Sequence, residues 1–126
     1  YHDIPGIDGL VPTCNCGRRG DLESLCSLTA IRMSLLPHLL KRYPKHALAR
    51  ETDVASAAKQ VRGLAARGDA MCREIFRIQA RALGLFFDEM INVFDPDALV
   101  VGGGAVEADE AFRQWFLDEI RVGMPE

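Results

Sequence analysis

Two cysteines separated by a single residue, Cys14 and Cys16, form the centre of the first constellation in this sequence that could carry chemistry. Two thiolates at this spacing can hold one soft cation, and zinc takes four ligands from cysteine, histidine and carboxylate side chains. His2 and Asp21 would supply the other two ligands. The flanking glycines would let the loop fold back around the ion. The same pattern also fits a tight, glycine-rich loop that holds no metal.

A carboxylate, Glu23, follows this loop where a helix is predicted to begin. Because a carboxylate accepts hydrogen bonds from neighbouring hydroxyls while it stays ionised, Glu23 could bind a sugar. An acidic residue in the first turn of a helix is also favoured by the helix dipole alone. The residue types leave both interpretations open.

A run of three glycines, Gly102-Gly103-Gly104, forms a second constellation. It lies between a predicted strand and a predicted helix, where free backbone N–H groups can meet an anion or a nucleotide. The run is not a dinucleotide-binding fingerprint, because the third residue after it is Glu107 rather than glycine. A tight turn without a ligand is the alternative.

The elements that position these side chains follow from hydrophobic periodicity, caps and helix breakers. Residues 1–20 are rich in proline and glycine and predict loop or short extended structure. Four helical segments are predicted after them: one from Asp21 that Pro37 ends or kinks, one over 54–67 between Asp53 and Gly68, one over 70–94 capped by Asp69, and one over 108–122.

The apolar run Ala-Leu-Val-Val over 98–101 is bounded by Asp95-Pro96-Asp97 and by the three glycines. This pattern predicts a short, buried, parallel strand, and with the helices it indicates an α/β fold. One strand cannot form a sheet alone. The other strands must therefore come from outside this segment, or the first twenty residues must supply some of them.

The composition narrows the class of protein. The 126 residues are 48% hydrophobic and 26% charged, which is typical of one globular domain. A net charge of −3 without a basic block disfavours a nucleic-acid-binding surface. Neither a membrane span nor a signal peptide is recognisable, and the few cysteines indicate a reducing cytoplasm. The chain lacks an initiator Met, and we expect it to be a piece of something longer.

Several further side chains are expected to be structural. Cys26 and Cys72 fall in helical patterns, which predicts small buried hydrophobic residues. His38 and His46 stand in a polar stretch and are expected at the surface. Trp115 is expected to pack in the core or in an interface.

The first constellation contains Cys14, Cys16, Gly17, Gly20 and Glu23, followed by Ser27, Ala30 and Ile31. In this register it resembles the zinc loop of the ROK family (repressors, open reading frames and sugar kinases). A later block consists of Ala82-Leu83-Gly84, Asn92, Asp95-Pro96 and 99–104. This block is similar to the family's second half. There a long helix ends in Asn-Pro and a strand delivers a glycine pair to the nucleotide. The two motifs stand in the correct order and cover the carboxy-terminal half of a family member.

Two positions depart from the family pattern. Asp21 replaces the family's third zinc cysteine, and a carboxylate in place of a thiolate softens affinity and selectivity for zinc. The family's zinc histidine stands in a Gly-His step, whereas His2 follows Tyr1 and lies further from Cys14.

The resemblance implies the second lobe of an actin-like (ribonuclease-H-like) sugar kinase fold over residues 1–126. Residues 1–20 would form the zinc-type loop region, and residues 21–126 the helices, the nucleotide-side strand and the glycine turn. The implied roles are as follows: Glu23 and His2 bind a hexose or amino-hexose; Gly102, Gly103 and Gly104 contact the adenosine part of ATP; His2, Cys14, Cys16 and Asp21 are the positions of a structural zinc.

The full-length protein would then transfer the γ-phosphoryl group of ATP, bound with Mg²⁺, to a hexose hydroxyl. Neither the catalytic base nor the phosphate loop of such a kinase is found in this segment. We therefore expect the segment alone to be inactive.

A second interpretation is a sugar-responsive transcriptional repressor of the same family. This half would bind an inducer and mediate assembly into a homo-dimer or tetramer, and nucleic acid would be bound only through an upstream winged helix. A third is a small zinc-loop interaction module without a ligand. That interpretation requires the segment to fold alone, which the single strand argues against.

Overall fold

The structure of the protein is a computed structural model that describes residues 1, 3–107 and 109–125. Its helical elements are α1 (Leu22–Cys26), α2 (Leu28–Ala30), the π-helical turn η1 (Ile31–Leu35), α3 (Leu36–Arg42), the 3-10 turn η2 (Ala47–Arg50), α4 (Val54–Ala66), α5 (Ala70–Phe94), α6 (Gly104–Glu107) and α7 (Glu110–Gly123). Within the described ranges, no helix has both the length and the apolar character that a membrane crossing requires.

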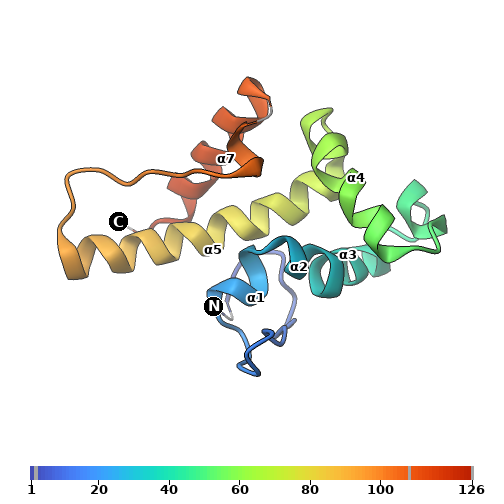
Figure 1. Ribbon diagram of the computed structural model, residues 1–126, viewed down its shortest axis with the longest axis horizontal. Coiled ribbons are helices and arrows are strands. Elements are labelled where there is room, and N and C mark those ends of the chain that lie inside the picture. Colours follow the sequence, from blue (N-terminus) through green and yellow to red (C-terminus); the bar gives the residue numbers. More distant parts are fainter. Residues whose placement is uncertain (2, 108, 126) are drawn as a thin grey trace.

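The long helix α5 is the centre of the fold (Figure 1). It packs against α7 on one side and against α1 and α3 on the other, while α4 meets it near its first turns. Its start is fixed by the Asp69 carboxylate, which accepts from the Cys72 N–H at 3.0 Å. Its end is fixed by Asp95, which adopts a left-handed conformation with φ 47°. The predicted helix over 70–94 is confirmed with the same bounds.

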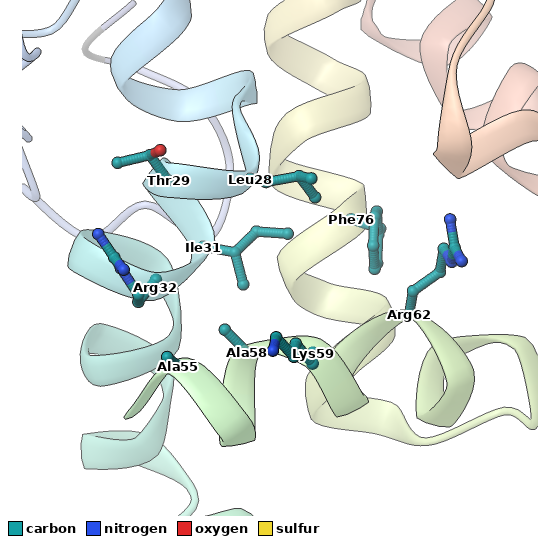
Figure 2. Close-up of a pocket in the computed structure, with 9 residues that line it drawn as sticks. All are labelled: Leu28, Thr29, Ile31, Arg32, Ala55, Ala58, Lys59, Arg62 and Phe76. Carbon is teal, nitrogen blue, oxygen red and sulfur yellow. The ribbon is translucent and has the colours of Figure 1, made fainter. Parts of the chain in front are cut away.

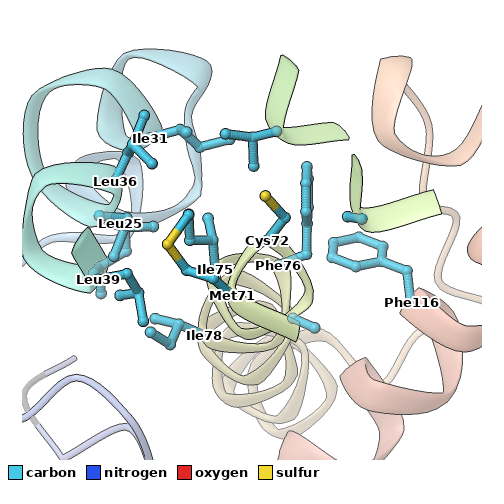
Figure 3. Packing of buried hydrophobic residues seen from close by; sticks show 14 of the residues in the cluster. Leu25, Ile31, Leu36, Leu39, Met71, Cys72, Ile75, Phe76, Ile78 and Phe116 are labelled. Carbon is cyan, nitrogen blue, oxygen red and sulfur yellow. The ribbon is translucent and has the colours of Figure 1, made fainter. Parts of the chain in front are cut away.

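The hydrophobic core surrounds α5 because this helix buries residues on more than one side. Met71, Ile75 and Ile78 are essentially inaccessible to solvent. Figure 3 shows them between side chains of the early helices and Phe116 of α7. Cys72 is fully buried in the same cluster, which confirms the prediction for that residue.

The crossing of α5 and α7 combines close backbone approach with paired side chains. The rings of Phe76 and Phe112 meet edge to face at 5.2 Å between centroids. Arg81 pairs with Glu119 at 2.8 Å, and the Arg73 guanidinium lies 4.7 Å from the centre of the half-buried Trp115 ring. Trp115 therefore serves packing, as the sequence predicts.

The helix predicted from Asp21 is interrupted earlier than expected. Asp21 caps α1, but the backbone breaks at Ser27, which has φ −88° and ψ 162° and caps α2 through a 3.0 Å bond from the Ala30 N–H. The amide of Gln79 donates to the carbonyls of Leu25 and Ser27 at 2.8 and 3.3 Å, so the carbonyls freed by the break are satisfied.

Pro37 does not end the helix, and that part of the prediction is wrong. It stands in the first turn of α3, directly after the π-helical turn η1. At this position a residue without an N–H is tolerated.

The segment over 98–101 is not a buried strand, so the prediction of a strand there is wrong for the described structure. Figure 1 shows it in the extended connection that returns from the end of α5 toward α6 and α7. Leu99 is 37% exposed and Val100 is 90% exposed. The described ranges contain no strand with which this run pairs, so its backbone has no ladder to join.

Residues 1 and 3–20 form loop structure, as predicted, and they are anchored to the helices. Ile4 and Ile7 are buried in the core, and Asp8 pairs with Arg42 at 2.7 Å. The Tyr1 hydroxyl donates to Glu89 on α5 at 3.1 Å. Burial, followed by this bond to Glu89, raises the pKa of Tyr1 to about 12.

Candidate functional site

The cysteine loop is closed by backbone hydrogen bonds. The Cys14 N–H donates to the Arg18 carbonyl at 2.7 Å, and the Gly17 N–H donates back to the Cys14 carbonyl at 2.9 Å. Thr13 and Arg19 form an isolated antiparallel bridge. Gly17 adopts φ +91°, which favours glycine. These bonds turn residues 14–16 into a tight bend.

The bend brings three of the four predicted metal ligands together. One ligand atom each from Cys14, Cys16 and Asp21 lies within 4.8 Å of both others. Two sulfurs and one carboxylate oxygen are donors that zinc accepts, so these residues fit such an ion. His2, the fourth predicted ligand, lies outside the described residues.

Hydrogen bonds set the protonation of this cluster. The Cys14 pKa is raised to about 11: a backbone hydrogen bond involving Cys16 lowers it, but the side-chain bond with Cys16, burial and the Asp21 carboxylate together outweigh that effect. The Asp21 pKa lies below its usual range, first because the carboxylate accepts from the Ser24 N–H. The cluster therefore presents one ionised carboxylate beside a thiol that holds its proton.

Glu23 lies beside this cluster. Its exposed side chain stands in the first turn of α1, and one of its oxygens lies 3.8 Å from Cys14 Sγ. Asp21, not Glu23, caps the helix, since Asp21 accepts from the Ser24 N–H at 2.9 Å. Glu23 also lines a small cavity of about 50 Å³ with Thr13, Asn15 and other residues of the loop, α1 and η1. The carboxylate is thus open to solvent at a small hollow.

The glycine run lies elsewhere, against α4. Gly103 has φ +104°, and the Gly104 carbonyl accepts from Arg62 at 2.6 Å. All three glycines are exposed, and the last of them, Gly104, begins the short helix α6. Arg62 therefore fastens this turn to α4.

Arg62 also lines a larger cavity of about 410 Å³ between α2, η1, α4 and α5 (Figure 2). Ile31 and Phe76 supply apolar walls. Arg32, Lys59 and Arg62 bring three cationic side chains to it. A cavity with apolar walls and cationic side chains suits a ligand that has a flat apolar part and an anionic part. No local sequence pattern marks this cavity, because its lining comes from four separate elements.

A second group of polar side chains also escaped prediction. His46, expected at the surface, has only 12% of its side chain exposed, and its Nε2 lies 2.9 Å from both Asp69 oxygens. The Leu48 N–H donates to His46 Nδ1, which assigns the ring proton to Nε2. Burial raises the pKa of Asp69, but the Cys72 N–H and His46 outweigh it and lower that pKa.

Cys72 completes the ligand atoms of this second group. Both ring nitrogens of His46 are already used in hydrogen bonds, and burial raises the pKa of the Cys72 thiol far above its usual range. The arrangement therefore fastens η2 to the start of α5 and does not suit a metal ion. Cys26 is similarly structural: it is half-buried, burial raises its pKa to about 12, and its thiol lies 3.4 Å from the Gln79 carbonyl oxygen.

Comparison with known proteins gives a consistent result. Residues 4–120 match the sequence model of the ROK family. The chain is 35% identical over 101 residues to a glucokinase of Thermotoga maritima, covering 79% of this chain and 32% of that protein. It is 28% identical over 104 residues to the DNA-binding transcriptional dual regulator NagC of Escherichia coli K12, covering 82% and 25%.

A glucokinase of Halalkalibacterium halodurans is 30% identical over 105 residues, which covers 77% of this chain and 30% of that protein. The chain therefore spans about a quarter to a third of the length of these curated relatives. No solved structure matches it.

Proposed function

The chain belongs to the ROK family, and we propose that it supplies the sugar-binding and adenosine-side residues of an ATP-dependent hexose kinase of the glucokinase type that acts in the cytoplasm. The observation that carries this proposal is the position of Glu23. Its exposed side chain stands at the start of α1, beside the cysteine loop and at the edge of a small hollow that Thr13 and Asn15 also line. A sugar hydroxyl can donate to such a carboxylate without competing with the helix cap.

The proposed nucleotide side is the larger cavity with the adjoining glycine turn. The apolar wall of Ile31 and Phe76 would contact the base, and Arg62 would orient the Gly102–Gly104 turn against the adenosine part of ATP. ATP with Mg²⁺ supplies the γ-phosphoryl group that a kinase transfers to a hydroxyl. No residue of this chain is assigned as the catalytic base, so the segment by itself is proposed to be inactive.

The proposed fold is the second lobe of an actin-like sugar kinase, with residues 1–20 as the zinc-type loop region. Its sheet requires strands that the described ranges do not contain. The apolar 98–101 run supports this proposal, because Val100 is 90% exposed and an extended apolar segment that is open to solvent is suited to pairing with a further strand. We propose that it becomes a strand when the remaining part of a full-length chain is present.

In the proposed metal site, Cys14, Cys16 and Asp21 hold a structural zinc, with His2 as the candidate fourth ligand. Zinc would crosslink the loop to the start of α1, because the Asp21 carboxylate would bind the ion and also caps that helix. The ion would therefore stabilise the position of Glu23, two residues further on.

A sugar-responsive repressor is the second candidate, because NagC matches 82% of this chain. This chain would then bind an inducer sugar and take part in a homo-dimer or tetramer. Sugar binding at Glu23 is common to both candidates, whereas phosphorylation of the bound sugar belongs only to the kinase.

The test uses the full-length protein that contains this chain. Calorimetry with glucose and with N-acetylglucosamine measures sugar affinity in the wild type and in Glu23→Gln. We expect a loss of about 1–3 kcal/mol in binding free energy, since the amide replaces a charged acceptor. Glu107→Gln is the matched control, because Glu107 is an exposed glutamate in α6. Unchanged sugar affinity in Glu23→Gln would contradict the proposal.

A coupled assay of ADP release in the presence of the sugar separates the two candidates. Sugar-dependent turnover of ATP supports the kinase. Sugar binding without turnover supports the repressor, and the isolated 126-residue chain should show no turnover in either case.

A further inference from the structure

Cys14 and Cys16 are arranged as a pair of neighbouring free thiols. They occupy the first and third positions of the turn that the Gly17 N–H closes on the Cys14 carbonyl at 2.9 Å. Their sulfurs lie within 4.8 Å of one another. A disulfide bond is about 2.05 Å long, so the sulfurs need to approach by at most about 2.8 Å. The side chains of a short glycine-flanked turn can make this movement without displacing a helix.

The two thiols differ in access. Cys16 is exposed, whereas Cys14 is 6% exposed and its Sγ lies 3.8 Å from a Glu23 oxygen. An oxidant in solvent therefore reaches Cys16 first. Cys14 stands behind it as the second thiol.

We propose that Cys14 and Cys16 form a thiol modification site that a peroxide closes reversibly into a disulfide within the loop. With hydrogen peroxide, the sulfur of Cys16 attacks one peroxide oxygen and the O–O bond breaks; the departing hydroxide takes up the Cys16 thiol proton and becomes water, and Cys16 is left as a sulfenic acid. The sulfur of Cys14 then attacks the Cys16 sulfur, the S–O bond breaks, and the hydroxide leaves with the Cys14 proton as a second water. Two thiols and one peroxide give one disulfide and two waters, and two electrons pass from sulfur to oxygen.

Asp21 makes this loop suited to such a pair. Asp21 carries a carboxylate rather than a third thiol, so the loop contains two thiols. Oxidation within the loop can therefore form a single disulfide. A disulfide is also incompatible with metal binding, since a metal ligand must be a thiolate. Oxidation and zinc would therefore compete for the same two sulfurs.

The test treats the full-length, metal-stripped protein with hydrogen peroxide, alkylates the remaining thiols and digests with trypsin. The peptide that ends at Arg18 contains Cys14 and Cys16 and no other cysteine of this chain. We expect it to lose two hydrogens and to escape alkylation. When the oxidised protein is reduced with dithiothreitol before alkylation, the same peptide should carry two alkyl groups.

Matched variants identify the partners. Cys16→Ser should abolish the loss of two hydrogens, and Cys26→Ser should leave it unchanged. Oxygen atoms added to Cys16 while Cys14 is still alkylated, or a disulfide that joins either thiol to Cys26 or Cys72, would overturn the proposal.

Zinc loaded before the peroxide should slow the reaction if the proposed metal site is correct. The same rate with and without zinc would refute the metal site and leave the disulfide standing, so the two failures can be told apart.

Discussion

Gly84 of α5 faces the backbone of Gly123 at the end of α7. A methyl group on Gly84 would lie 2.8 Å from the Gly123 Cα and would also meet the Ile120 carbonyl oxygen. Contacts this close involve backbone atoms on both sides, so no side chain can rotate away to relieve them. The two helices that form the largest packing interface therefore depend on an absent side chain.

Gly84→Ala should destabilise the protein by about 1–3 kcal/mol, because the added methyl forces the helices apart. Gly63→Ala is the matched control: Gly63 lies within α4, and a methyl there meets nothing within 4 Å. The control should be neutral or more stable by up to about 1 kcal/mol, since alanine favours helix. Urea unfolding measures both, and equal midpoints for the two variants would contradict the proposed close packing.

Two substitutions of Asp21 should change the affinity for zinc in opposite directions. Asp21→Cys should raise zinc affinity on the order of tenfold, because a third thiolate joins the cluster. Asp21→Asn should lower it, while keeping the cap on the Ser24 N–H. Competition titration with a coloured chelator measures the affinities. If the cysteine variant binds no more tightly, the loop does not hold zinc in the proposed way.

The same pair of variants separates the metal from the cap. Without zinc, Asp21→Cys should cost about 1 kcal/mol of stability through the lost cap, whereas Asp21→Asn should cost little. Unfolding in the presence of a strong chelator measures this difference, and a costly Asp21→Asn would show that the carboxylate stabilises α1 by its charge rather than by its hydrogen bond.

Stability should depend on pH through Asp69. Its pKa is lowered in the folded protein, so its contribution is present above the ordinary aspartate pKa of about 3.9 and is lost as pH falls through the lower folded value. Asp69→Asn keeps a helix cap but removes this titration. The difference in unfolding free energy between wild type and variant should therefore shrink below about pH 4. A difference that stays constant between pH 6 and pH 3 would contradict the assignment.

Arg62→Met should weaken ATP binding to the full-length protein by about tenfold, because a charged hydrogen-bonding group is lost from the cavity and from the Gly104 carbonyl. Arg67→Met is the control, since Arg67 is exposed just after α4. Fluorescent-nucleotide displacement measures both affinities. Equal losses in the two variants would point to a general effect of surface charge.

The helices that the sequence predicted well are those whose signals are local. Asp53 and Asp69 both cap the helices that were expected, and Gly68 adopts a left-handed conformation with φ +92° between them. Cap, periodic apolar face and terminator all lie within the segment that they define. The close approach of Cys14, Cys16 and Asp21 was predictable for the same reason, because these residues are near one another in sequence.

The features that escaped prediction depend on distant residues. The break at Ser27 is stabilised by Gln79, which comes 52 residues later, and the burial of His46 depends on Asp69, which comes 23 residues later. The run over 98–101 has the composition of a strand, yet a strand needs a neighbour that the described ranges do not contain. Hydrophobic pattern shows that a segment can be buried, not what covers it.

The hydrogen bond from Gln79 to the Leu25 carbonyl also sets an order of events during synthesis. Its two residues are 54 positions apart, and one of them lies in the middle of α5. A chain made from its amino terminus cannot form this bond until residue 79 has left the ribosome. The cysteine loop and α1 are made before α5, so they reach their final orientation only after this part of α5 has been synthesised.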